Sequence, residues 1–105
     1  MSARKLRLVL ASDARRDIRD VLTYTEQQWG KAQRRDYRRA LYEVFDELTW
    51  FPELGRLRPE YGSGVRSYRV RQHIVVYRAD DAELRIARVL HESRDAAGGL
   101  REPSR

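Results

Sequence analysis

The sequence has no cysteine and little of several other residue types. Its 105 residues include only three prolines, six glycines, two histidines and two lysines. Without cysteine, the chain forms neither a disulfide scaffold nor a cysteine-ligated zinc site, and it has no thiol nucleophile. It also has no run of about 18 apolar residues, so a transmembrane helix is not expected.

The first residues lack the pattern of a secretory signal. The segment MSARKLRLVLA contains Arg7 within its only apolar stretch, which is too short and too interrupted for a signal peptide. These absences favour a cytoplasmic protein. The length predicts one domain, residues 1–105, with a small core of its own.

Charge is plentiful and biased. The formal net charge is +6, and 20 of the 22 basic residues are arginine. A positive field favours acidic partners such as nucleic acid, an acidic protein or an anionic membrane, and arginine suits phosphates and carboxylates. A GC-rich genome, which replaces lysine by arginine everywhere, is the alternative interpretation of the bias.

The first half of the chain predicts a strand and two helices. Alternating leucines indicate a half-buried strand over Lys5–Ala11. Ser12-Asp13 resembles a helix N-cap, followed by a helix over Ala14–Gln28. Gly30 is a stop signal, and a second helix runs over Lys31–Phe51. Apolar residues recur three and four positions apart in both: Ala14, Ile18, Val21, Leu22 and Thr25, then Tyr37, Leu41, Val44, Leu48 and Phe51.

The short joint predicts an antiparallel hairpin of these helices. Basic residues at the start of the first helix and acidic residues at the end of the second are each unfavourable with the dipole of their own helix. Antiparallel packing would place these two groups side by side. We therefore expect contacts between two sets: Arg15, Arg16 and Arg19 on the first helix, and Glu43, Asp46 and Glu47 on the second.

The second half predicts a small sheet. The segment Phe51–Gly64, rich in proline and glycine, is expected to be a loop. Strands are predicted over Val65–Val70, His73–Arg78 and Leu84–His91, with a turn at Asp80-Asp81. Their connections are too short for parallel crossovers, so the strands form an antiparallel meander.

These elements define an α+β fold of two layers, with a helical hairpin on one face of the sheet. Leu84, Ile86 and Leu90 are expected on one face of the last strand, and Ala87 and Val89 on the other. The second face would expose an apolar patch, which usually marks a binding surface. The polar tail, about residues 93–105, is expected to be partly disordered or ordered by a partner.

Four short pieces occur in a fixed order: Ser12-Asp13-Ala14, then Tyr24 followed by Trp29-Gly30, then FPELGR from Phe51, and finally IARVLHESRD from Ile86. Together they resemble the RelE/ParE toxin superfamily of bacterial toxin–antitoxin modules. The resemblance covers about Leu6 to Leu100. The closing Arg88-Val89-Leu90-His91 is similar to the ParE branch.

This resemblance implies a RelE-like order of strand, two helices and three strands. It implies the toxin of a type II module, which inhibits DNA gyrase and is not itself an enzyme. A cognate antitoxin would neutralise it, and DNA would be contacted only indirectly, through the antitoxin or gyrase. No cofactor, metal or membrane partner is implied.

The RelE branch provides an alternative, a ribosome-dependent mRNA endonuclease that needs no metal. Its candidate catalytic groups here would be His73, Tyr77, Arg88 and His91, acting as base, acid and phosphorane-stabilising cation. RelE itself uses lysines of its middle strands. This chain has only Lys5 and Lys31, both far upstream, which weakens the nuclease hypothesis. A third hypothesis is an inactive module that retains only the regulatory complex.

The predicted partner-binding residues lie in or after the three late strands. They are Arg66, Tyr68, Arg71, Arg78, Ala87, Arg88, Val89, His91 and Arg94. The alternatives are a solvated sheet edge for the arginines and a structural hydrogen bond for each histidine.

Two further groups have open interpretations. Arg34, Arg35, Arg38 and Arg39 form a basic patch on the second helix, which is either a DNA or gyrase contact or a solvated face. Trp29, Trp50 and Phe51 are expected to pack in the core or at the hairpin joint.

Overall fold

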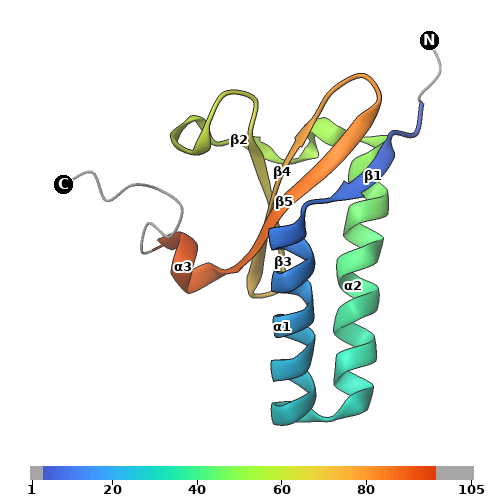
Figure 1. Ribbon diagram of the computed structural model, residues 1–105, viewed down its shortest axis with the longest axis vertical. Coiled ribbons are helices and arrows are strands. Elements are labelled where there is room, and N and C mark those ends of the chain that lie inside the picture. Colours follow the sequence, from blue (N-terminus) through green and yellow to red (C-terminus); the bar gives the residue numbers. More distant parts are fainter. Residues whose placement is uncertain (1–3, 97–105) are drawn as a thin grey trace.

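A five-stranded sheet covered on one side by a helical hairpin makes up the fold (Figure 1). The computed structural model describes residues 4–96. The elements are β1 (Arg7–Leu10), α1 (Ser12–Trp29), α2 (Lys31–Trp50), β2 (Arg56–Leu57), β3 (Arg66–Val70), β4 (His73–Ala79), β5 (Glu83–His91) and α3 (Glu92–Ala96). Two short 3-10 helices, η1 (Pro52–Leu54) and η2 (Pro59–Tyr61), flank β2. The predicted α+β architecture is confirmed.

Both long helices follow the predicted apolar stripes. Ala14, Ile18 and Leu22 of α1 are buried, and so are Leu41 and Phe45 of α2. Gly30 joins the helices with φ of 95°, a left-handed conformation that costs glycine little. The predicted hairpin is therefore confirmed. No helix among the described residues is long and apolar enough to cross a bilayer.

The start of α1 differs from the prediction. Ala11 occupies the N-cap position, and no side chain caps the helix there. Ser12 and Asp13 already lie inside the helix, where the Asp13 carboxylate faces the positive end of the helix dipole. The predicted Ser12-Asp13 cap is wrong because β1 runs almost directly into α1.

The sheet order is β1-β5-β4-β3-β2. The connections predicted to be antiparallel, β3 to β4 and β4 to β5, are confirmed. β1 pairs in parallel with β5, from Arg7 opposite Glu83 to Leu10 opposite Ile86. The connection from β1 to β5 contains the helical hairpin and the strands β2, β3 and β4, so it is long enough for parallel neighbours.

A β-bulge in β5 overturns the predicted faces of that strand. Val76 pairs with Arg88 and Tyr77 with Ile86, which leaves Ala87 as the extra residue. The bulge shifts the alternation of side chains by one position. Val89, which is 3% exposed, therefore packs in the helix-facing core with Ile86, and the predicted exposed patch of Ala87 and Val89 does not form.

The other face of the sheet is also covered, by the chain's own loop. Ile74, Val76 and Leu90 form a second buried cluster with Val65, and Tyr61 packs against it. Within the predicted loop, residues 51–64, η2 brings Tyr61 onto this cluster, while β2 pairs with β3 at the edge of the sheet. The exposed apolar sheet face expected from the sequence is therefore absent from the described chain.

The loop is also attached to the sheet at Gly55. The Tyr77 hydroxyl donates to the Pro52 carbonyl at 2.6 Å and accepts from the Gly55 N–H at 2.8 Å. A Cβ at Gly55 would overlap the Tyr77 ring and the Ser67 carbonyl oxygen. Close backbone approach therefore requires glycine at this position.

Several large apolar side chains remain in solvent. Trp29 is 71% exposed, Trp50 41% and Phe51 53%, so the predicted packing of these three residues in the core or joint is wrong. Tyr24, Leu54 and Leu57 are exposed as well. Most of these exposed groups lie in α1 near the hairpin joint or just after α2, and Leu57 lies on the edge strand β2.

The predicted ion pairs between the helix ends do not form. Asp46 pairs with Lys5 at 2.9 Å, and Arg16 pairs with Asp13 at 3.1 Å within its own helix. The hairpin has the predicted direction, but the segment before β1 supplies the partner of Asp46.

A partly buried cluster around Asp17 attaches α1 to β5. The Asp17 carboxylate accepts from Arg88 Nε at 2.7 Å, from Arg88 Nη2 at 3.1 Å and from the Val89 N–H at 2.9 Å. β1 pairs with β5 only as far as Ile86. Asp17 therefore supplies the acceptor for a backbone N–H beyond the end of β1.

Replacing Asp17 with alanine should lower the free energy of unfolding by about 2 kcal/mol, because a charged network loses its acceptor while Arg88 stays half-buried. Asp46→Ala, which breaks the exposed pair with Lys5, should cost less than about 1 kcal/mol. Urea unfolding measures both. Equal losses in the two variants would show that Asp17 does not attach the helix to the sheet.

Candidate functional site

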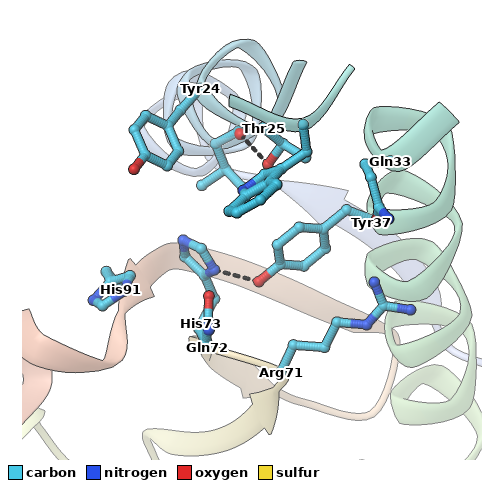
Figure 2. A pocket seen from close by; sticks show the side chains of 10 residues that line it. Tyr24, Thr25, Gln33, Tyr37, Arg71, Gln72, His73 and His91 are labelled. Carbon is cyan, nitrogen blue, oxygen red and sulfur yellow. Dashed lines mark hydrogen bonds between the residues drawn. The ribbon is translucent and has the colours of Figure 1, made fainter. Parts of the chain in front are cut away.

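An open cleft of about 640 Å³ lies between the hairpin and the end of the sheet (Figure 2). Tyr24 and Trp29 of α1 and Tyr37 of α2 line its helical side. The β3–β4 turn and the paired strand ends, with His73 and His91, line the other. The cleft exists because the far part of the hairpin extends beyond the sheet (Figure 1).

Three aromatic rings form a row along the base of the cleft. A hydrogen bond joins the Tyr37 hydroxyl to His73 Nδ1, and their ring centroids are 5.4 Å apart. The His91 ring meets His73 edge-to-face at 5.4 Å, because the two residues are paired across β4 and β5. In Figure 2 the second ring nitrogen of His73 points away from Tyr37, so it is available to an occupant of the cleft.

The first two rings of the row are neutral at neutral pH. Burial, and secondarily the neighbouring His91, lowers the pKa of His73 from 6.5 to about 4. Burial raises the pKa of the Tyr37 hydroxyl. A hydrogen-bonded pair of uncharged groups binds polar atoms, but His73 is too weakly basic to act as a strong general base.

Arg71 lies at the edge of the cleft in the turn between β3 and β4. Its φ is 54°, in the left-handed region, which costs a side-chain-bearing residue on the order of 1 kcal/mol. Its guanidinium pairs with Asp36 at 2.9 Å and lies 5.4 Å from the centre of the Tyr37 ring. These contacts hold a cation beside the aromatic row.

The outer part of the cleft is apolar and exposed. Tyr24 is 61% exposed and Trp29 71%, the two highest values among the large apolar residues that the structure describes. Exposed aromatics beside a concave surface are typical anchors for a protein partner. No group of three or more candidate metal ligands occurs among residues 4–96.

The family described as "ParE toxin of type II toxin-antitoxin system, parDE" matches residues 8–96. The chain belongs to the ParE toxin family. It is 34% identical over 91 residues to Toxin ParE1 of Caulobacter vibrioides, which covers 87% of this chain and 94% of that toxin. The predicted superfamily and branch are confirmed.

A solved structure supports the fold of this ParE-family chain. A chain of the "Chromosomal ParDE TA system from P. aeruginosa" superposes with a TM-score of 0.71. The match covers 83% of this chain and 96% of that one, at 18% sequence identity. At this identity the comparison establishes the architecture alone.

The structure brings two of the nine predicted partner-binding residues, Arg71 and His91, to the cleft of the ParE-family chain. Arg66 instead donates to the Gly55 carbonyl at 2.7 Å and helps to hold the loop. Arg88 is bound to Asp17. Val89 is buried in the helix-facing core, so its side chain is not available to a partner.

The remaining four of the nine lie away from the cleft lining. Arg78 on β4 and Arg94 on α3 are exposed, while Tyr68 and the bulge residue Ala87 are half-buried. They remain predicted contacts. The predicted tail begins within α3, and its residues from 97 onward lie outside the described part of the chain.

The four groups of the nuclease alternative do not converge. His73 and His91 are adjacent, but Tyr77 is 0% exposed and its hydroxyl is bonded to the loop. Arg88 is held by Asp17, which neutralises its charge. The arrangement therefore offers no base, acid and free cation around one phosphate position.

Sequence reasoning missed most of the helical side of the cleft. Tyr37 was predicted as core and is buried, but its hydroxyl also reaches His73. Tyr24 stood in the family motif without a role, and Trp29 was assigned to packing. The available signal was two large aromatics next to a hairpin joint that is too short to cover them.

The low pKa of His73 predicts a pH-dependent stability. Between pH 6.5 and about 4 the unfolded state binds a proton that the folded state does not, so stability falls as the pH falls. From pH 7 to pH 5 the free energy of unfolding should drop by up to about 2 kcal/mol more in the wild type than in His73→Gln. Urea unfolding at both pH values checks this, and identical pH dependence would contradict it.

Proposed function

We propose that the protein is the toxin of a type II toxin–antitoxin module, which inhibits DNA gyrase in the cytoplasm and is neutralised by a cognate antitoxin. Family membership over residues 8–96 supports this proposal most strongly. The protein acts by binding instead of by catalysis.

The geometry of the cleft agrees with a binding mechanism. Trp29 and Tyr24 offer exposed aromatic surface, while Arg71 and His91 offer polar groups at the rim and base. We propose that a segment of the antitoxin occupies this cleft. An apolar side chain of that segment would pack on Trp29 and an acidic one would meet Arg71, which shares its present partner Asp36 with Arg39.

The net charge of +6 supports the same mechanism. A cationic toxin associates rapidly with an acidic antitoxin tail because long-range attraction raises the association rate. Apolar burial in the cleft then slows dissociation. The complex is therefore expected to be a hetero-oligomer of toxin and antitoxin.

Purified toxin should inhibit supercoiling of relaxed plasmid by gyrase, and cleaved DNA should accumulate, because the toxin traps the enzyme on its cut substrate. Antitoxin added beforehand should restore supercoiling. An agarose-gel supercoiling assay with the toxin, gyrase and ATP measures both effects.

Two results would contradict this function. One is full supercoiling activity at a large excess of folded toxin. The other is cleavage of ribosome-bound mRNA in a translation extract, which would instead support the nuclease alternative.

The aromatic rim gives a second prediction. The double substitution Tyr24→Ala and Trp29→Ala should weaken antitoxin binding at least about ten-fold, because exposed aromatic anchors commonly contribute more than about 1.4 kcal/mol each to an interface. Isothermal titration calorimetry with purified antitoxin measures the change in Kd.

The matched control is Phe51→Ala with Leu57→Ala, which removes two residues of similar exposure outside the cleft lining, one directly after α2 and one on β2. It should leave the affinity within about three-fold of the wild type. An equal loss in both double variants, or a loss in the control alone, would move the antitoxin site away from the cleft.

A further inference from the structure

A second surface, on the outward side of α2, has a different chemistry from the cleft. Arg35, Arg38 and Arg39 surround an open hollow of about 600 Å³ together with Tyr42. These positions are separated by three or four residues, so their side chains project from the same face of the helix. All three arginines are exposed. In Figure 1 this part of α2 lies at the edge of the molecule, with α1 on one side.

The arginines of this face have few partners of opposite charge. Among the described residues, no carboxylate lies within ion-pair distance of Arg35 or Arg38, and Arg39 reaches Asp36 only at 3.9 Å. Asp36 is itself held more closely by Arg71, at 2.9 Å. The cluster therefore retains most of its positive charge.

Tyr42 orients the middle of the cluster. The Arg38 guanidinium lies 4.8 Å from the centre of the Tyr42 ring, a cation–π contact that holds the planar group over the ring. The Tyr42 ring in turn packs edge-to-face on the buried Phe45 at 5.1 Å. The Arg38 guanidinium is thus held in place by a side chain that is itself anchored in the core. A cation held in this way suits an anion in a fixed position.

Acidic groups mark one end of the hollow. Asp46 is paired with Lys5 at 2.9 Å, and Glu43 lies beside it on the lining. These two carboxylates would repel an anion, so the N-terminal part of the face, around Arg35 and Arg38, is the part that suits one. The charge of the surface therefore changes along the helix, from positive at Arg35 to negative at Asp46.

We propose that this arginine face of α2, comprising Arg35, Arg38, Arg39 and Tyr42, binds the phosphate backbone of duplex DNA directly. Duplex DNA carries one negative charge per about 1.7 Å of its axis, so it can satisfy several clustered guanidinium groups at once. Arginine binds phosphate oxygens in bidentate fashion, and contact with the backbone needs no base sequence.

The composition of the face favours nucleic acid over an acidic protein. Protein interfaces have an apolar core, whereas interfaces with DNA are polar and strongly basic. The hollow has only the half-buried Tyr42 as an aromatic group, while the cleft has the exposed Tyr24 and Trp29. The two surfaces thus suit two different kinds of partner.

This inference goes beyond the proposed function, because it concerns the toxin alone and involves neither gyrase nor antitoxin. If the toxin contacts the DNA backbone directly, it can bind the same DNA molecule as its target enzyme. Failure of the following test would leave gyrase inhibition untouched, since the assay contains only toxin and DNA.

The test measures fluorescence anisotropy of a labelled duplex of about 20 base pairs titrated with toxin at several salt concentrations. Replacing all three arginines with alanine should weaken binding at least about ten-fold at low salt and reduce the slope of log K against log salt by about 2 to 3, because each lost phosphate contact removes about 0.9. Replacing all three with lysine should keep most of the slope, since the charge remains.

The control variant changes three exposed arginines of the sheet, Arg7, Arg56 and Arg85, to alanine, and so has the same net charge as the α2 alanine variant. It should retain the wild-type slope and lose less affinity than the α2 variant. Circular dichroism melting verifies that each variant folds.

Three results would overturn the proposal. They are absence of DNA binding by the wild type, equal losses of affinity and slope in the two alanine variants, and equally effective displacement of the DNA by an acidic peptide of matched charge. The last result would assign the face to an acidic protein partner.

Discussion

The contacts of Asp17 with Arg88 and the Val89 backbone hold the functional surfaces in place. β1 covers the edge of β5 only as far as Ile86, and the bulge at Ala87 then changes the direction in which the strand presents its side chains. Asp17 binds the strand just beyond that point. This contact adds to the core packing that holds α1 and α2 on the sheet, and the cleft residues of both helices lie opposite His73 and His91.

With the hairpin attached in this way, the apolar side chains fall into a buried set and an exposed set. The helix-facing core and the loop-covered cluster around Val76 and Leu90 bury both faces of the central strands. Among residues 4–96, large aromatic groups then remain exposed only on the part of the hairpin next to its joint and where α2 ends. The first of these places has the hydrogen-bonded Tyr37 and His73 beneath it, which makes it a shaped cleft instead of a flat patch. The hollow on α2 lacks such exposed aromatic groups and carries arginines instead, so α2 lies between an aromatic cleft and a cationic surface.

Much of the fold was predictable because its signals are local. The stripes that end in Leu22 and Leu48, the stop at Gly30 and the short turns between the late strands each depend on residues close in sequence. The site was predicted less well. Arg71 and His91 were expected at a binding surface and do line the cleft, but Tyr24 and Trp29 were given no site role or were assigned to packing. Val89 was placed on an exposed face because strict alternation along β5 takes no account of a bulge, and a bulge follows from pairing with Val76 and Tyr77 on another strand.

The sequence by itself determined the order of the first strand, the two long helices and the three late strands, the antiparallel hairpin, the basic character and, through its motifs, the toxin family. These properties depend on periodicity, turn residues and composition, which are all written along the chain. Only the tertiary structure decided that β1 pairs with β5, that Tyr61 packs on the cluster of the second sheet face and that Tyr37 meets His73. Each of these depends on contacts between residues dozens of positions apart, which are selected by competition among all the surfaces that the folding chain can bury.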